Sequence, residues 1–242
     1  MSKRVAVSAH RGGGEDHPRG TWEAYQSALD IGAEYVEFDV RKLRDGTLVC
    51  FHDPRTSRDG PALATLSYRE LCDAVGYEVP TVPAVLKLLA GRAIGHVDLK
   101  ETGYEPEVVR LVLAALGPGG FVVTSLEDES IARVSTEFPE VRTALSLGRG
   151  RAELSAWQLP FTRLRELLPL RRIRACGAQW VAVDKNVARR GVLWQCARHG
   201  IGAMVWTVDE PELIDRFLTD SRVDVLVTNR PRFALDRRRQ LS

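Results

Sequence analysis

The length, composition and charge of the chain argue against several classes of protein. Its 242 residues are 44% hydrophobic and carry 34 basic and 32 acidic side chains, a formal net charge of +2. That length suits one large α/β domain over residues 1–242, and the near balance of charge gives no field that favours nucleic acid or a membrane surface. Four cysteines without a CxxC pair indicate neither a zinc site nor a redox centre.

We expect a cytoplasmic protein without a stable membrane anchor. A predicted strand begins at residue 4, which leaves no room for a signal peptide with an apolar region of about 7 to 15 residues. Apolar runs stay short of the roughly 18 residues that suggest a membrane span. The oligomeric state is left open by the sequence.

Eight short segments rich in Val and Ile recur along the chain and predict β-strands. They lie at residues 4–9, 34–40, 93–99, 121–125, 141–147, 178–184, 201–207 and 223–228. Stretches with helical periodicity lie between them, and several end at glycine; they are residues 21–32, 105–117, 127–138, 187–200 and 210–220. Eight strands with helical crossovers predict a (β/α)8 barrel, the TIM-barrel architecture, rather than an open sheet.

The longest gap between predicted strands, about residues 41–92, is a predicted insertion after the second strand. It opens on RKLRDGTLVCFHDP at 41–54, in which Asp45 and Gly46 form a strong hairpin-turn signal. Segments that follow the C-terminal end of a barrel strand build the mouth of the active site. We therefore expect this insertion to cap the site.

Polar side chains gather near the ends of the predicted strands. Glu37 and Asp39 are two residues apart on one strand and so leave the same face, and His96, Asp98 and Lys100 repeat this spacing on the next. Buried carboxylates are costly unless they are paired or bind a cation. Oxygen ligands without cysteine favour Mg²⁺ or Ca²⁺. The alternative is a buried charge network that holds the strands together.

Two histidines and a further cation fall at the same rim. His10 and Arg11 end the first predicted strand, and His52 follows the hairpin. Paired groups that titrate near neutrality suit general acid–base catalysis, although a structural role is the alternative. Arg11 and Lys100 supply positive charge that can hold a phosphate. A metal, two histidines and two cations together predict a phosphodiester site.

Five stretches of the chain carry a resemblance to a known family. They are AHRGG at 9–13, GAEYVEFDVRKLRDGTLVCFHDP at 32–54, HVDLK at 96–100, VVTS at 122–125 and VWTVDEPELIDRFLTDSRVDVLVTNRP at 205–231. In this order they resemble the glycerophosphodiester phosphodiesterase family. The resemblance implies a TIM barrel that hydrolyses a small-molecule glycerophosphodiester to glycerol 3-phosphate and an alcohol, with one divalent cation, Mg²⁺ or Ca²⁺.

The resemblance also implies roles for particular residues. His10 and His52 resemble the acid–base pair: one helps a substrate hydroxyl attack phosphorus, the other protonates the leaving alcohol, and water then opens the cyclic phosphate. Glu37 and Asp39 resemble metal ligands, and Asp98 stands where the family usually has a glutamate ligand.

Three further positions complete the expected site. Arg11 and Lys100 resemble the phosphate-binding cations of the family. Trp206 resembles a wall for the glycerol or the leaving group.

The chain departs from the family pattern at two loops. Residues 18–21 read Pro-Arg-Gly-Thr where the family usually has Pro-Glu-Asn-Thr, and Asn229 stands where an aspartate is common. Arg19 adds a positive charge at the rim, and we expect Gly20 to loosen the turn. These changes leave the preferred substrate open.

Two other functions stay open. A lysophospholipase D-type phosphodiesterase would need an apolar groove, which Trp157, Leu159 and Phe161 could line, although packing of a helix against the barrel is the alternative for these three. A barrel that binds phosphorylated ligands without turnover would be expected to lack the two histidines.

Overall fold

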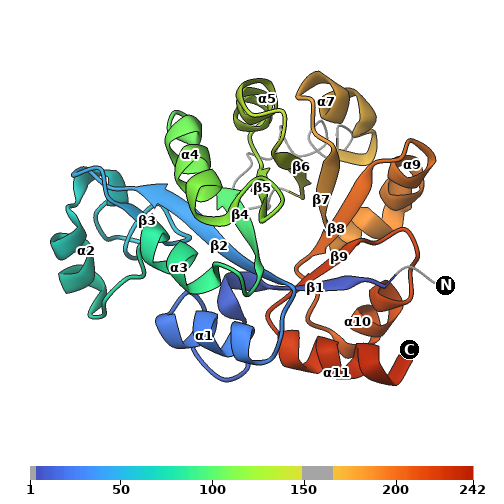
Figure 1. Cartoon of the computed structure of the whole chain (residues 1–242), viewed down its shortest axis with the longest axis horizontal. Helices are drawn as coiled ribbons and strands as arrows, with labels where there is room; N and C mark the ends of the chain where they lie inside the picture. The colour runs from blue at the N-terminus through green and yellow to red at the C-terminus, as the bar shows by residue number, and fades with distance from the viewer. Residues whose placement is uncertain (1–3, 149–165, 242) are drawn as a thin grey trace.

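A ring of eight parallel strands forms the centre of the molecule, within the residues that the computed structural model describes, 4–148 and 166–241. Around the ring the order is β1-β2-β4-β5-β6-β7-β8-β9, and β1 closes it by pairing with both β2 and β9. The predicted (β/α)8 barrel is confirmed (Figure 1). The strands are β1 Ala6–Ala9, β2 Tyr35–Lys42, β4 Ile94–Leu99, β5 Phe121–Ser125, β6 Arg142–Leu147, β7 Trp180–Asp184, β8 Gly202–Trp206 and β9 Val225–Thr228.

Helices surround this ring on the outside (Figure 1). The chain returns from most strands through a helix before it enters the next strand, as parallel pairing requires. Within the described ranges these helices are α1 Trp22–Asp30, α3 Val82–Leu89, α4 Glu105–Leu116, α5 Asp128–Glu137, α7 Leu170–Ala175, α8 Lys185–Val187, α9 Leu193–Arg198, α10 Pro211–Leu218 and α11 Pro231–Leu241.

One predicted helix is wrong as a continuous element. The expected helix over residues 187–200 is divided into α8, a π-helical turn at Ala188–Val192 and α9. Gly191 has a φ of 91°, which lies outside the helical region. The break therefore comes from the backbone conformation of one glycine. Hydrophobic periodicity does not predict that conformation.

The insertion after β2 forms a small subsidiary layer. β3 (Leu48–Cys50) pairs antiparallel with the end of β2, and this pairing carries β2 to Lys42, two residues beyond its predicted end. A short turn at Leu63–Thr65 and the helix α2 (Tyr68–Val75) follow, and α2 lies at the left edge of Figure 1, outside the ring. Buried Leu71 of α2 packs with Val49 of β3 in a separate apolar cluster.

Side chains on the barrel strands alternate between two environments. Phe38 points outward and belongs to the apolar layer between barrel and helices, together with Leu86 of α3 and Val109 of α4. Tyr35 points inward and belongs to an apolar cluster with Met204. Because inward positions recur every two residues, the polar residues that follow Tyr35 on β2 face the barrel interior toward its C-terminal end.

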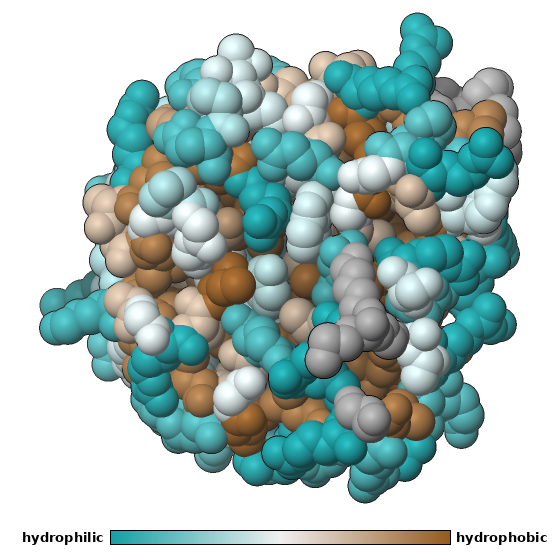
Figure 2. Space-filling view, turned by 45° about the vertical axis from the view of Figure 1, so that its right-hand side comes forward, coloured by the Kyte–Doolittle hydropathy of each residue, from teal (hydrophilic) through white to brown (hydrophobic). Residues whose placement is uncertain are grey.

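Charged side chains on the outer surface pair locally. Arg237 contacts Asp215 at 2.6 Å, and Arg222 contacts Asp220 at 2.6 Å. On the face drawn in Figure 2, hydrophilic and hydrophobic areas alternate. Among the described helices, none is both long enough and apolar enough to cross a membrane.

Candidate active site

A cavity of about 150 Å³ opens at the C-terminal ends of the barrel strands. Seven of the eight predicted site residues line it, and the eighth, Asp39, contacts two of them. The insertion contributes His52 to this lining. The seven are His10, Arg11, Glu37, His52, Asp98, Lys100 and Trp206.

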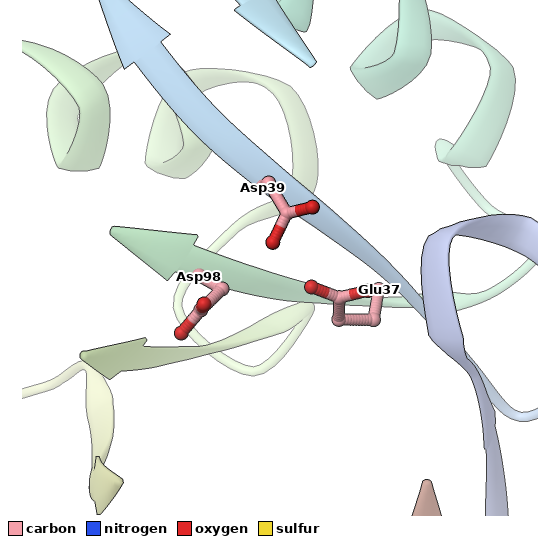
Figure 3. A group of neighbouring side chains, drawn as sticks. All are labelled: Glu37, Asp39 and Asp98. Atoms are coloured by element: carbon pink, nitrogen blue, oxygen red, sulfur yellow. The ribbon is translucent and has the colours of Figure 1, made fainter. Parts of the chain in front are cut away.

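The three predicted carboxylates converge within this region. Glu37 and Asp39 project from β2, and Asp98 projects from β4 at the position paired with Asp39 (Figure 3). One oxygen from each lies within 4.8 Å of the other two. Oxygen donors at such spacing fit a hard divalent cation such as Mg²⁺ or Ca²⁺.

Two basic side chains lie among these carboxylates. Arg11 Nε is 2.9 Å from Asp39 Oδ2, and Lys100 Nζ is 2.7 Å from Asp39 Oδ1 and also contacts Asp98. Burial works to raise the pKa of Asp39, but the positive charges of Lys100 and Arg11 outweigh it and hold that pKa below its usual range. The charge network considered as an alternative from the sequence is thus present, and it shares its carboxylates with the candidate metal site.

Glu37 is held differently from Asp39. Its Oε2 accepts a hydrogen bond from the backbone N–H of Arg11 at 2.7 Å. Burial, with the nearby charges of Asp39 and Asp98, raises the pKa of Glu37 well above its ordinary value. A cation bound beside Glu37 would relieve this cost, which is a second reason why the residues present fit a metal ion.

His10 lies on a tight turn, η1 (His10–Gly12), directly after β1. Arg11 has a φ of 51° and is the one described residue other than glycine with a positive φ. Gly12 is required at the next position, because a Cβ there would lie 2.6 Å from the backbone carbon of Ala24. The turn is therefore pressed against α1, and its geometry is determined by close backbone contact.

In each histidine of the predicted pair, one ring nitrogen lies within hydrogen-bond distance of a side-chain oxygen. His10 Nδ1 lies 2.7 Å from Asn229 Oδ1, and His52 Nδ1 lies 2.6 Å from Asp53 Oδ1. His10 Nε2 lies 3.9 Å from Glu37 Oε2. Burial lowers the pKa of His10 to about 4 and also lowers the pKa of His52. Both rings also line the cavity, as proton transfer to a bound ligand would require.

Asp98 is oriented by a chain of side chains of which the sequence analysis identified only His96. Thr124 Oγ1 donates to Asp98 Oδ1 at 2.6 Å and lies 3.2 Å from His96 Nε2, while His96 Nδ1 lies 3.2 Å from Ser8 Oγ. All three partners are buried. The inward position of Thr124 on β5 follows from strand alternation, but its contact with Asp98 depends on the register between β4 and β5.

Trp206 has an unused hydrogen-bond donor. Its indole Nε1 is buried and finds no acceptor among the described residues. Buried indole N–H groups usually have a partner. Since Trp206 lines the cavity, an oxygen of a bound ligand would satisfy it.

The loop before α1 is better anchored than its sequence indicates. Gly20 has a φ of 77°, and its N–H donates to the carbonyl of Arg11 at 2.8 Å. Thr21 caps α1 by accepting from the N–H of Ala24 at 3.3 Å. The expectation that Gly20 loosens this turn stays a prediction, while its backbone N–H ties the loop to the turn that carries His10.

Arg19 extends from the same loop to the end of β9. Its Nη1 donates to Asn229 Oδ1 at 3.2 Å. Arg19 does not line the described cavity. Arg19 therefore contacts the amide beside His10 rather than the cavity wall.

Histidines, cations and carboxylates at the mouth of a parallel barrel define the class of a phosphoric diester hydrolase, and the comparisons with known proteins agree. The model of the "Glycerophosphoryl diester phosphodiesterase family" matches residues 10–233. The chain belongs to this family.

One relative and one solved structure illustrate a resemblance over nearly the full length of the chain. It is 23% identical over 247 residues to the glycerophosphodiester phosphodiesterase of Caldanaerobacter subterraneus subsp. tengcongensis, over 94% of this chain and 95% of the relative. A glycerophosphodiester phosphodiesterase from Agrobacterium tumefaciens superposes with a TM-score of 0.75 at 24% identity, over 96% and 99% of the two chains.

A third similar protein was solved with a ligand. The phosphodiesterase of Oleispira antarctica, in complex with the product sn-glycerol-3-phosphate, has a TM-score of 0.73 at 19% identity, over 97% of this chain and 96% of that one. At these identities, the two likenesses to solved structures show the fold alone.

Proposed function

We propose that this chain hydrolyses glycerophosphodiesters to glycerol 3-phosphate and an alcohol. The observation that carries the proposal is the cavity of about 150 Å³ at the barrel mouth, which is lined by two histidines, two basic side chains and carboxylates. Membership of the family and the product bound to the Oleispira antarctica protein support the substrate class.

His10 and His52 are the proposed acid–base pair. One ring accepts the proton of a substrate hydroxyl as its oxygen attacks phosphorus, and the other donates a proton to the oxygen of the leaving alcohol. Water then opens the cyclic phosphate, with the two proton transfers reversed. The oxygen partner of each Nδ1 leaves Nε2 as the nitrogen available to the substrate.

The remaining site residues bind and orient the phosphate in this proposal. Arg11 and Lys100 line the cavity and attract its negative oxygens. Glu37, Asp39 and Asp98 would hold one Mg²⁺ or Ca²⁺, which when bound neutralises charge on a phosphoryl oxygen. Trp206 offers its free indole N–H to an oxygen of the glycerol or of the leaving group.

The direct test is hydrolysis of glycerophosphocholine, glycerophosphoethanolamine and a lysophospholipid, each with Mg²⁺, with Ca²⁺ and with EDTA. We expect metal-dependent release of glycerol 3-phosphate from the first two. His10→Ala and His52→Ala should each lower kcat by about 10²-fold or more, with unchanged circular dichroism. His17→Ala and His199→Ala, at two exposed histidines, are the matched controls.

Three other outcomes would contradict parts of this proposal. Turnover equal to that of the parent in His10→Ala or in His52→Ala would reject the acid–base pair. Faster turnover of the lysophospholipid would favour the lysophospholipase D-type function, whose expected groove residues Trp157, Leu159 and Phe161 lie outside the described residues. Tight binding of glycerol 3-phosphate without turnover of any diester would favour a non-catalytic barrel.

A further inference from the structure

Asn229, which directly follows β9, contacts side chains from three separate segments of the chain through its one side-chain amide. Its Nδ2 donates to Asp209 Oδ2 at 2.7 Å. Its Oδ1 lies 2.7 Å from His10 Nδ1 and accepts from Arg19 Nη1 at 3.2 Å. The orientation of this amide therefore decides whether His10 Nδ1 faces a hydrogen-bond acceptor or a donor.

The chemistry on both sides determines that orientation. A carboxylate only accepts hydrogen bonds, so the side of the amide that faces Asp209 must be its NH₂ group. A guanidinium only donates, so the side that faces Arg19 must be its oxygen. A flipped amide would place oxygen against oxygen on one side and two donors together on the other.

Asp209 is itself held in place. Its Oδ1 accepts from the backbone N–H of Asn229 at 2.8 Å and from Thr228 Oγ1 at 3.1 Å, while its Oδ2 accepts from the Asn229 amide. The carboxylate thus reaches the end of β9 through both of its oxygens. Hydrogen bonds to an ionised carboxylate are stronger than bonds between neutral groups.

The backbone keeps His10 beside this amide. The N–H of Gly14 donates to the carbonyl of Asn229 at 2.7 Å, and the N–H of Gly13 donates to the carbonyl of His10 at 2.9 Å. A Cβ at Gly13 would lie 2.8 Å from the ring of Pro231. The turn that carries His10 and the end of β9 therefore form one interlocked unit.

We propose that Asp209 and Asn229 are positioning residues that hold the neutral ring of His10 with its proton on Nδ1 and its Nε2 free on the cavity side. Because Asn229 Oδ1 only accepts, the ring nitrogen beside it must donate. In the neutral ring, Nε2 then carries a lone pair. This inference rests on the proposed function, since it concerns how a catalytic histidine would be presented to substrate.

The first measurement is the tautomer of His10, read from the ¹⁵N shifts of both ring nitrogens in metal-free protein at neutral pH. We expect the parent to show Nδ1 protonated and Nε2 unprotonated. Asn229→Leu should shift His10 to a mixture of both tautomers. Thr228→Val, which removes one bond to Asp209 but leaves the amide contact, is the control and should keep the parent tautomer.

The second measurement separates positioning from substrate binding. Asn229 does not line the described cavity, so N229L should lower kcat on the order of 10²-fold and leave KM within about twofold. Asn229→Asp alone places two carboxylates in contact and should also lose activity. The exchanged pair, D209N with N229D, restores one amide and one carboxylate. Its kcat should be at least about tenfold higher than that of N229D alone.

The proposal fails if N229L keeps the parent tautomer or the parent kcat, or if the exchanged pair recovers nothing. Because the tautomer is read without substrate or metal, the two proposals can be separated. An inactive parent with the expected tautomer shift would reject the proposed function and keep the positioning pair. An active parent with mixed tautomers would do the reverse.

Discussion

Lys100 shows most directly what one residue contributes to this site. Its ammonium contacts both Asp39 and Asp98. Lys100→Met would leave these carboxylates without that partner, and breaking a buried ion pair costs about 3 to 5 kcal/mol. We expect K100M with EDTA to lose roughly this much free energy of unfolding, measured in urea, and Mg²⁺ or Ca²⁺ to restore part of the loss.

Lys42 provides the matched control, since it forms an ion pair with Glu107 in which both side chains are well exposed. Surface pairs of this kind contribute about 1 kcal/mol or less. Lys42→Met should therefore change the stability little. If K100M lost no more than K42M, the buried carboxylates would not depend on Lys100.

At the residue scale, the types of the site residues were predictable and their pairings were not. The spacing of Glu37 and Asp39 predicts that they share a face, because strand alternation is a local property. Asn229 was noted in the sequence only as a departure from the family pattern. It bonds to Asp209, which is 20 residues away in the sequence, and to His10, which is 219 residues away. No local sequence pattern predicts contacts between residues so far apart in the chain.

At the scale of the elements, two glycines with nearly the same positive φ lie in different surroundings. Gly12 has a φ of 78° and Gly32 a φ of 77°. A Cβ at Gly12 would lie 2.6 Å from the backbone of Ala24, whereas a Cβ at Gly32 would meet nothing within 4 Å. A substitution at Gly32 would introduce backbone strain alone, whereas the same substitution at Gly12 would also disturb the contact between η1 and α1.

Alanine at each position tests this difference. Gly32→Ala should cost about 1 to 2 kcal/mol of stability from strain alone and leave turnover unchanged. Gly12→Ala also places alanine at a positive φ and must in addition push η1 away from α1, so it should lower both the stability and kcat. Thermal unfolding and the hydrolysis assay measure both effects, and equal behaviour of the two variants would contradict the close contact at Gly12.

The turn between β2 and β3 is joined to α2 by one carboxylate. The backbone N–H groups of Tyr68 and Thr47 donate to Asp45 at 2.8 and 3.0 Å, and these bonds lower its pKa. Because the folded-state pKa is depressed, the stabilisation is present above the unfolded pKa of about 3.9 and is lost as the pH falls through the folded value.

Asp45→Asn tests this pH dependence. The neutral amide keeps an acceptor but lacks the charge, so the stability gap between parent and variant should narrow as the pH falls below about 4. Urea unfolding over a series of pH values measures the gap. A constant gap would mean that the charge of Asp45 adds nothing to these bonds.

At the scale of the whole molecule, a cation held by carboxylates from β2 and β4 would stabilise the closed barrel. A ligand that binds only the folded state raises its stability by mass action, by about 2.7 kcal/mol at 100 times its Kd. We expect the Tm to rise with Mg²⁺ or Ca²⁺ concentration. Glu37→Gln should weaken this dependence, and an unchanged metal titration would make Glu37 a structural residue.

The barrel could be predicted from the sequence because each of its units has a local signal. All eight predicted strand segments overlap a barrel strand, from β1 at Ala6–Ala9 to β9 at Val225–Thr228. The division of the expected helix over 187–200 had no such signal. It depends on the left-handed conformation of Gly191, and a glycine permits that conformation without requiring it.

The sequence by itself determined the order of strands and helices, the face on which each strand residue lies and the kinds of side chain at the barrel mouth. Alternation, helical periodicity and residue chemistry are properties of neighbours in the chain. The tertiary structure decided that Lys100 shares its carboxylates with the candidate metal site, that Gly20 anchors the His10 turn and that Asp209 orients Asn229. Such contacts depend on how neighbouring strands and the loops that follow them are arranged in space, as where β2 pairs with β4 and β8 pairs with β9, and no local pattern in the sequence contains that arrangement.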